Sequence, residues 1–361
     1  EIGVRLVGSE MCIRDRLKGT ITSDVTLAAG NTYKLSGEYI VEEGATLHIE
    51  EGVKIIAVYD DIADYILVKQ GGKINAVGTP DKPIVMTSEK EEPGAWGGIH
   101  ICGRAHTNAE GGKGSSEIGG AVYGGNDDAD NSGTLQYIRL EYTGFAFDEE
   151  HEANGISFYG VGNGTIVDHC QAYKGSDDGF EFFGGSVNVS NLVAVSCSDD
   201  SFDWTEGWNG KGTNLVAYQE AESTLGYDCD CLMECDNNGS NNAATPVAHP
   251  VLKNLILVGN GGSKQGIRLR AGTEVEIDNA KVCGKGQPLT VETALTENAL
   301  KNGTSKLTNI TLTSELSSKE GIYTHADFIA VTSNKVDANL SYSSFEDIRK
   351  ECSWMNGSWV K

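Results

Sequence analysis

Residues 176–183 read Ser-Asp-Asp-Gly-Phe-Glu-Phe-Phe, and residues 198–205 read Ser-Asp-Asp-Ser-Phe-Asp-Trp-Thr. Asp177 and Asp199 open matching acidic pairs 22 residues apart, and each pair precedes a short strand-like triplet. A repeat of this length, with one polar turn and one short strand in each copy, is typical of a solenoid whose turns stack on one another. The repeat therefore predicts an architecture and places acidic side chains on it.

The triplet pattern extends to further repeats on both sides. Apolar, polar and apolar residues alternate in it, as in a strand with one buried face. The triplets are Ile156-Ser157-Phe158, Phe180-Glu181-Phe182, Phe202-Asp203-Trp204, Met233-Glu234-Cys235, Ile267-Arg268-Leu269 and Leu289-Thr290-Val291. A second column of polar residues follows them, namely His169, Asn191, Asn214, Asn254, Asn279 and Asn309. Two strand columns without a helical period predict an all-β parallel β-helix, a single-chain solenoid, with the Asn residues as an internal amide ladder.

The composition favours one long domain. The chain has 361 residues with 46 Gly and 6 Pro, and it holds no apolar run of the length that a transmembrane segment needs. Residues 1–16 lack the repeat and resemble a translated sequencing adapter, so we interpret them as a non-native leader. We expect the parallel β-helix to span residues 17–340. Short helical patterns near its end predict helical insertions and a C-terminal cap at residues 341–361, which would protect the open sheet edge.

The charge and the cysteines narrow the function classes. The net charge of −24, from 52 acidic and 28 basic residues, opposes binding of nucleic acid, and of anionic polysaccharide unless cations intervene. Eight cysteines remain when Cys12 is set aside with the leader. This even number is compatible with disulfides and an oxidising compartment, and packed free thiols are the alternative.

A series of short phrases carries a family resemblance. The phrases lie at residues 44–52, 71–80, 83–88, 96–99, 130–137 and 269–273, and they accompany the two Ser-Asp-Asp passages. As a set they resemble the secreted or lipid-anchored right-handed β-helix proteins of Bacteroidetes, within the pectin lyase-like superfamily. The resemblance covers residues 17–282. It implies a right-handed helix and an extracellular or outer-surface anchored location, but no settled activity.

The middle residues of the triplets form a ladder in which Glu181, Asp203 and Glu234 precede Arg268. Adjacent coils lie about 4.8 Å apart, so these acids would repel one another unless a proton, an arginine or a metal ion compensates them. Three interpretations are open. In the first, the acids are solvated or form turns. In the second, they hold Ca²⁺ with the turn residues Asp177, Asp178, Asp199 and Asp200. In the third, Glu181, Asp203, Glu234 and Arg268 are catalytic.

Aromatic residues near the ladder are candidates for glycan binding. Trp208 lies in a polar turn beside Glu206, where an exposed indole would stack on a sugar ring, and Tyr159 follows the first triplet. Packing against the adjacent coil is the alternative role for Trp208.

These features together predict an extracellular or cell-surface glycan-binding module with structural calcium, whose partner is a polysaccharide. Two other function classes stay open. One is a polysaccharide lyase or glycoside hydrolase that uses the acidic face, and the other is a structural or adhesive surface protein. Binding of a glycan without turnover would distinguish the glycan-binding module from the enzyme.

Overall fold

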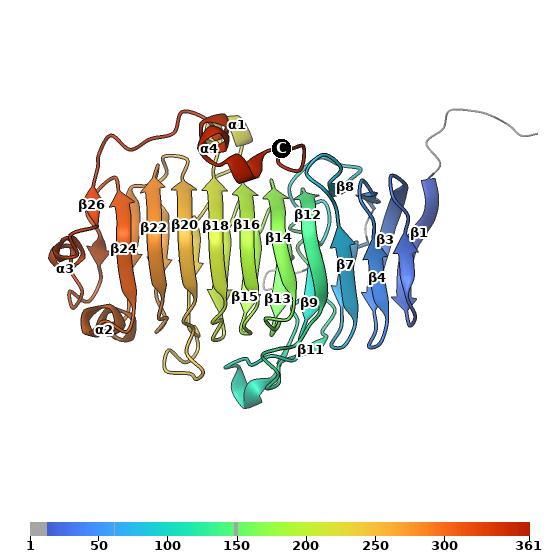
Figure 1. The fold of residues 1–361 in the computed structure, drawn as a ribbon, viewed down its shortest axis with the longest axis horizontal. Coiled ribbons are helices and arrows are strands. Elements are labelled where there is room, and N and C mark those ends of the chain that lie inside the picture. The colour runs from blue at the N-terminus through green and yellow to red at the C-terminus, as the bar shows by residue number, and fades with distance from the viewer. Residues whose placement is uncertain (1–12, 61, 148–150) are drawn as a thin grey trace, which may run out of the picture.

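The computed structural model describes residues 13–60, 62–147 and 151–361, and side chains from Arg16 onward. The chain winds into stacked coils whose strands pair in parallel, coil upon coil (Figure 1). This arrangement is the parallel β-helix expected from the repeat, with the right-handed winding that the family resemblance implied. Residues 1–12, most of the proposed leader, lie outside the described residues, and residues 13–16 begin strand β1 (Ile13–Ile21).

The coils present three faces. The first face starts at the ends of β1 and β3 (Thr32–Val41) and continues through β6 (Tyr65–Val68), β9 (Ile99–Cys102), β13 (Ile156–Tyr159), β15 (Phe180–Phe183), β17 (Phe202–Thr205), β19 (Met233–Cys235), β21 (Gln265–Leu269), β23 (Gln287–Val291) and β25 (Ser317–Ser318). The second face consists of β2 (Val25–Leu27), β4 (Thr46–Ile49), β7 (Lys73–Val77), β12 (Gly133–Glu141), β14 (Ile166–Tyr173), β16 (Asn188–Val195), β18 (Lys211–Tyr218), β20 (Val251–Val258), β22 (Glu276–Cys283), β24 (Lys306–Leu312) and β26 (Lys335–Val336). The third face has separate strands only early in the chain, at β5 (Lys54–Ala57) and β8 (Ile84–Ser88).

The second and third faces merge at β12, which pairs with β7 through its first half and with β8 through its second. The residue between the halves, Tyr137, has φ 52°, and the equivalent residues of the next six coils have φ between 53° and 62°. Asparagine adopts this left-handed region more readily than other non-glycine residues. The need to bend each long strand once therefore explains why Asn recurs in this column.

The Asn column forms the amide ladder that the sequence predicted, but on the outer surface. The Nδ2 groups of Asn214, Asn254 and Asn279 each donate to the Oδ1 of the preceding Asn at 2.8–3.0 Å. Asn254 and Asn279 are exposed. The expectation of an internal ladder was wrong because the left-handed bend turns the Asn side chain outward while the flanking apolar residues point inward.

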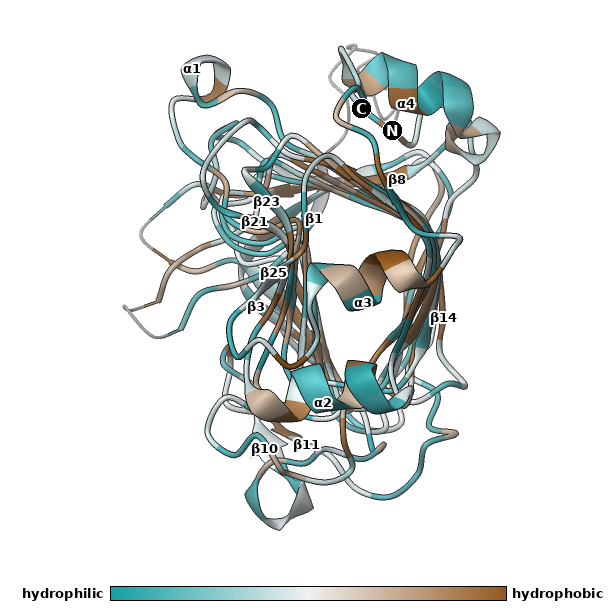
Figure 2. Cartoon of the chain, turned by 90° about the vertical axis from the view of Figure 1, so that its left-hand side faces the viewer, coloured by the Kyte–Doolittle hydropathy of each residue, from teal (hydrophilic) through white to brown (hydrophobic). Residues whose placement is uncertain are grey.

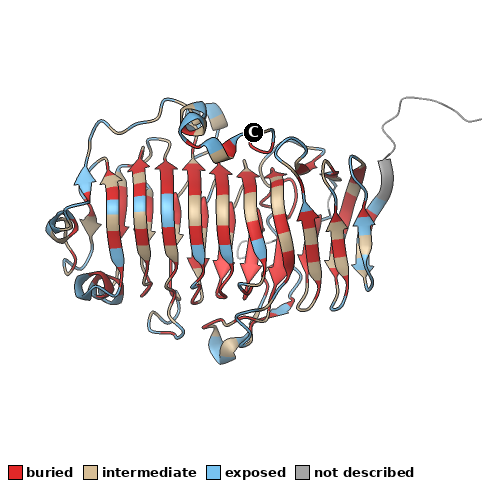
Figure 3. Cartoon of the chain, viewed as in Figure 1, coloured by how far each residue is buried: buried red, intermediate tan, exposed pale blue. Residues whose placement is uncertain are grey.

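An apolar core runs through the coils from Leu17 to Phe328. Figure 3 shows buried positions recurring on the strands of successive coils. The outer residues of the triplets stack in register, as predicted, and are at most 2% exposed. Aromatic rings continue this order, with Phe158 on Phe182 and Phe180 on Phe202 at centroid distances of 5.1 and 5.7 Å. All eight cysteines of the described residues are buried free thiols, so packed thiols and not disulfides are found.

Helices α2 (Ala294–Asn302) and α3 (His325–Ala330) lie across the last coil and cover the open end of the core (Figure 2). Residues 341–361, which we expected to be the cap, instead run back along the outside of the earlier coils (Figure 1). This segment, the C-terminal strap, contains α4 (Phe345–Glu351) and a short 3-10 helix, η2 (Ser353–Met355).

The strap lies on the side of the coils because an apolar stripe there needs cover. Ile348, Met355 and Trp359 are buried against outward-facing Val216 and Ile256. Far along the strap, the Ser358 amide donates to the Pro80 carbonyl at 2.8 Å. The strap therefore connects the C-terminal end of the chain to coils formed by much earlier residues. Periodic patterns in the sequence do not predict such a contact. In the described part of the chain, no helix is long and apolar enough to cross a membrane.

Candidate functional site

The predicted ladder is present on the first face, with the predicted register. Parallel pairing places Glu181 beside Asp203, Asp203 beside Glu234, and Glu234 beside Arg268 on strands β15, β17, β19 and β21. The three acids are half-buried, and Ser157 stands before them at 0% exposure. The interpretation in which the ladder acids are simply solvated is therefore wrong for these three, since each has lost part of its contact with water.

The acidic pairs occupy the turns that lead into β15 and β17. Asp178 and Asp200 are 6% and 4% exposed, Asp177 is half-buried and Asp199 is exposed. Asp178 Oδ1 accepts from the Asp200 amide at 2.8 Å, and Asp200 Oδ1 accepts from the Cys231 amide at 2.6 Å. The second Asp of each pair therefore bonds the backbone of the next coil, not that of its own turn, and fixes the stacking of the turns.

Six carboxylates gather on these two coils, and we call them the acidic face: Asp177, Asp178, Glu181, Asp199, Asp200 and Asp203. Oxygens of Asp178, Glu181 and Asp203 lie within 4.8 Å of one another, as do those of Asp177, Asp178 and Asp199. Within the described residues, no Lys or Arg forms an ion pair with any of the six. The face therefore concentrates like charge without a directly paired Lys or Arg among the described residues, and Arg270 and Lys264 act on Asp203 and Asp199 only from a distance.

Burial and mutual repulsion raise the pKa of every carboxyl of the acidic face. Loss of hydration comes first and neighbouring carboxylates follow, and together they raise the pKa of Asp177 to about 7 and that of Asp199 to about 6. The same causes raise the pKa of Asp178, Glu181, Asp200 and Asp203 well above the ordinary range. At neutral pH, protons or a cation therefore stabilise the four most strongly affected groups, Asp178, Glu181, Asp200 and Asp203.

The continuation of the ladder has its own cations. Arg268 Nη1 lies 2.9 Å from Glu234, and its Nε lies 3.2 Å from Glu292. Arg270 pairs with Glu234 as well, and its Nε lies 2.7 Å from Asp236. Both guanidinium groups are therefore engaged as counter-charges, and the pKa of each is raised by its carboxylate partners against the effect of burial.

The acidic face fits a calcium ion by its donor set. Ca²⁺ binds six to eight oxygens at 2.3–2.6 Å, so oxygens that share an ion lie up to about 5 Å apart. Asp203 Oδ1 and Asn154 Oδ1 are buried and without a hydrogen-bond partner. Asn154 points at the face, since its Nδ2 donates to Glu181 Oε2 at 2.5 Å and to Ser157 Oγ at 3.0 Å. Two unpaired oxygens beside three clustered carboxylates are what an oxygen-coordinated cation would satisfy.

The aromatic residues proposed to bind glycans are in the core. Trp208 is 1% exposed, its ring lies 4.1 Å from that of Phe182, and its Nε1 donates to the Val187 carbonyl at 3.1 Å. The expectation of an exposed indole was wrong because the corner of the coil leaves room for the ring inside, where burying it stabilises the fold. Trp208 has no face free for a sugar.

Tyr159 and Glu206 have structural roles beneath an insertion at residues 103–131, which carries η1 (Glu110–Gly112), β10 (Gly114–Ser115) and β11 (Val122–Tyr123). Tyr159 is 0% exposed and donates to Glu117 at 3.2 Å. Glu206 accepts from Tyr123 and Thr107 at 2.7 Å each. Neither residue is placed to bind a glycan, which corrects the prediction for both.

Sequence reasoning missed Asn154, Glu117 and Asp236. Asp236 directly follows a triplet and Asn154 lies two residues before one, so their positions relative to the repeat could have revealed them. Glu117 comes from the insertion, and burial raises its pKa to about 7. The only signal in the sequence for Glu117 was the large number of residues between the strands that flank the insertion.

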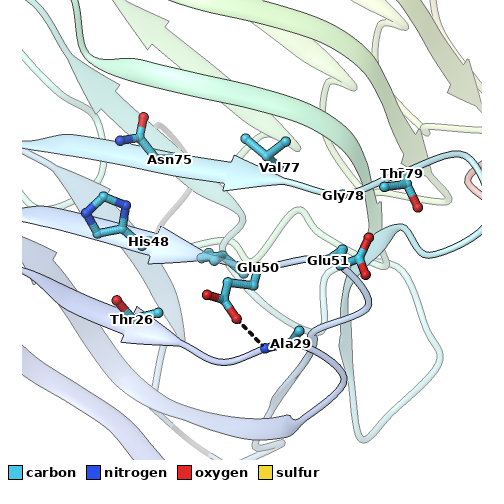
Figure 4. Close-up of a pocket in the computed structure, with 10 residues that line it drawn as sticks. Thr26, Ala29, His48, Glu50, Glu51, Asn75, Val77, Gly78 and Thr79 are labelled. Atoms are coloured by element: carbon cyan, nitrogen blue, oxygen red, sulfur yellow. Dashed lines mark hydrogen bonds between the residues drawn. The ribbon is translucent and has the colours of Figure 1, made fainter.

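A separate hollow lies on the second face near the start of the chain (Figure 4). It encloses about 730 Å³ and is lined by His48, Glu50 and Asn75 among others. Glu50 is engaged with the Ala29 amide at 2.8 Å. The hollow is wide open, and its lining residues include two acids, Glu50 and Glu51, in contrast to the six of the acidic face.

The fold defines the chain as a right-handed parallel β-helix protein. Residues 19–360 match the family of pectate-lyase-like β-helix domains, and the chain belongs to that family. No curated protein matches the sequence significantly. The same holds for solved structures.

Proposed function

We propose that the protein is a polysaccharide-binding β-helix protein of the cell surface or the extracellular space, and that its acidic face binds Ca²⁺ and through it a glycan. The observation that carries the proposal is the gathering of six carboxylates on two adjacent coils, none of which forms an ion pair with a Lys or Arg of the described residues. Without a ligand, the repulsion between these carboxylates and their lost hydration would destabilise the folded protein at neutral pH.

The cation would also make the face able to meet a glycan. A bare acidic surface repels uronate polysaccharides, whereas a bound divalent ion inverts the local charge and leaves coordination positions for carboxylate or hydroxyl oxygens. Aromatic stacking does not contribute here, because Trp208 and Tyr159 are buried. In this proposal, Asp178, Glu181 and Asp203 hold the ion and Asn154 orients Glu181.

A second function, glycoside hydrolysis, is favoured by one distance. Oxygens of Glu181 and Asp203 lie within 4.8 Å of each other, and retaining glycosidases place their two carboxyl groups about 5–5.5 Å apart. A carboxyl with a raised pKa is suited to act as the general acid. A lyase role for Arg268 is disfavoured, since Glu234 and Glu292 already hold its guanidinium.

Calorimetric titration with Ca²⁺ tests the proposal, with the Glu181→Gln/Asp203→Asn variant beside the unchanged protein. Glu276→Gln is the matched control, because Glu276 lies on the second face and pairs with Lys306. We expect binding that the double variant loses and the control keeps. Absence of Ca²⁺ binding in the unchanged protein would contradict the metal site.

The glycan is tested next, by retention on a panel of immobilised polysaccharides with Ca²⁺ or EDTA and by assays for reducing ends and unsaturated products. Calcium-dependent retention without product supports the binding module. Product formation that the double variant loses would replace it with the enzyme. No retention on any glycan, with self-association or cell adhesion instead, would favour a structural surface protein.

A further inference from the structure

The C-terminal strap and the Asn ladder enclose a small cavity far from the acidic face. Its volume is about 130 Å³, and the ladder residues Asn214, Asn254 and Asn279 line one side. Trp354 of the strap lines the other side. Water occupies about 30 Å³ per molecule in the liquid, so the cavity holds about four waters. This space suits one sugar ring that keeps part of its surface in solvent.

The ladder offers hydrogen-bonding groups that its own bonds do not use. Each Asn amide has two N–H donors and an oxygen with two lone pairs. The chain of bonds from Asn279 to Asn254 to Asn214 uses one donor of each of the first two residues and one lone pair of each of the last two. A second N–H therefore remains on each amide. These groups repeat from coil to coil, about 4.8 Å apart, which is close to the spacing of equatorial hydroxyl groups on alternate carbons of a sugar ring.

Trp354 supplies the apolar surface that a sugar ring needs. It is half-buried, whereas its neighbour Trp359 is 0% exposed, at a ring distance of 6.2 Å. The floor between Trp354 and the ladder is apolar, formed by Val216, Leu255 and Ile256. An accessible indole opposite a row of amides is a common composition of sites for neutral carbohydrates, since it matches the C–H face and the hydroxyl edge of the ring.

One ion pair is part of the lining of the cavity. Lys281 of β22 pairs with Glu351 of α4, and Tyr342 donates to Glu351 at 2.8 Å. The charges neutralise each other, so the cavity has no strong preference for an ionic ligand. This distinguishes it from the acidic face, which would require a cation.

We infer that this cavity is a binding site for a single neutral sugar residue, such as a branch or an end of a polysaccharide, held between Trp354 and the amides of Asn214, Asn254 and Asn279. The site is independent of calcium and of the acidic face. In combination with the acidic face it would give the protein two contacts with one glycan, and the affinities of linked contacts multiply when both are engaged.

The test uses the methyl glycosides of glucose, galactose and rhamnose as probes, in EDTA, and follows the indole N–H and Asn side-chain signals by NMR. We expect saturable shifts of the Trp354 indole and the ladder amides for at least one glycoside, with a dissociation constant of about 1–10 mM, as is usual for so small a ligand. Because EDTA removes calcium, failure of the metal proposal leaves this result unchanged.

Two variants test the site and one controls it. Asn254→Gly removes an amide yet suits the backbone at φ 60°, and Trp354→Leu keeps an apolar side chain on the strap without the aromatic face. Each should weaken binding at least about tenfold. Asn309→Gly makes the same change in the Asn column outside the cavity, where the Asn309 side chain donates to Asp278, and should leave binding unchanged. No saturable shift with any probe up to about 100 mM, or equal loss in the control variant, would overturn the inference.

Discussion

The ladder of charged residues on the first face has two halves that carry similar acids. The negative charge of these acids is compensated in one half and not in the other. Glu234, on β19, has Arg268 and Arg270 beside it, within hydrogen-bonding distance. Asp203 and Glu181, one and two coils earlier, form no ion pair with a Lys or Arg of the described residues and lie beside each other, the turn acids and Asn154. The compensated half has the form of a structural ion-pair network. The uncompensated half has the form of a site that a proton or a cation would stabilise. We therefore propose Ca²⁺ binding for this half.

Removing an arginine from the compensated half should lower the stability of the fold more than removing a lysine from an exposed ion pair. Arg270→Gln would remove the ion-pair partner of buried Asp236 and would leave Glu234 with Arg268 alone, so we expect the free energy of unfolding to fall by about 3 kcal/mol. Urea denaturation followed by circular dichroism measures this change. Lys306→Gln, which breaks the exposed pair with Glu276, is the control and should cost less than about 0.5 kcal/mol. Equal losses in both variants would show that the network contributes no more than a surface pair.

The uncompensated half should make the calcium-free protein less stable as the pH rises. Its carboxyls have pKa values raised in the folded state, such as about 6 for Asp199 and about 7 for Asp177. The folded chain therefore binds more protons than the unfolded chain above pH 4, and stability falls as the pH increases through the folded-state values. We expect the Tm in EDTA to be about 5 °C lower at pH 8 than at pH 5.

Calcium should remove most of that difference at pH 8, and the Glu181→Gln/Asp203→Asn variant should show a smaller pH dependence than the unchanged protein. Differential scanning calorimetry at fixed ionic strength measures both effects. A Tm that rises from pH 5 to pH 8 in EDTA would mean that the acidic face is not strained by its charge, and the argument for a cation would lose its basis.

The two halves also show what the sequence could and could not foretell. The register of Glu181, Asp203, Glu234 and Arg268 was predictable because every triplet buries its outer residues, and a slip by one residue would expose them. The fold followed from the same constraint. The ladder's position on one face was therefore fixed by local alternation repeated from coil to coil.

What escaped prediction depends on contacts distant in sequence. Tyr159 is buried by the insertion that carries Glu117, and Trp208 fills a corner whose size depends on the neighbouring coils. The strap reaches back to Pro80, which no periodic pattern indicates. The outward direction of the Asn ladder depends on a left-handed bend that alternation alone does not specify.

The sharpest comparison of the two halves uses the same substitution in each. Glu234→Gln weakens pairs with Arg268 and Arg270, whose other partners remain, so we expect a loss of about 1 kcal/mol in the free energy of unfolding at pH 8 in EDTA. Glu181→Gln removes a charge that has no Lys or Arg partner among the described residues and keeps an oxygen for the Asn154 amide, so we expect a gain of about 1 kcal/mol.

The comparison rests on the opposite signs of the two changes in the free energy of unfolding. Both residues are half-buried glutamates in the same ladder, so effects of the substitution on packing and on strand propensity are nearly equal in the two variants. Urea denaturation of both variants in EDTA gives the signs, and repeating it with calcium should reverse the gain of Glu181→Gln while it leaves the loss of Glu234→Gln in place. If both substitutions destabilise the calcium-free protein, the two halves do not differ in charge compensation, and Glu181 is held by contacts that stabilise its ionised form.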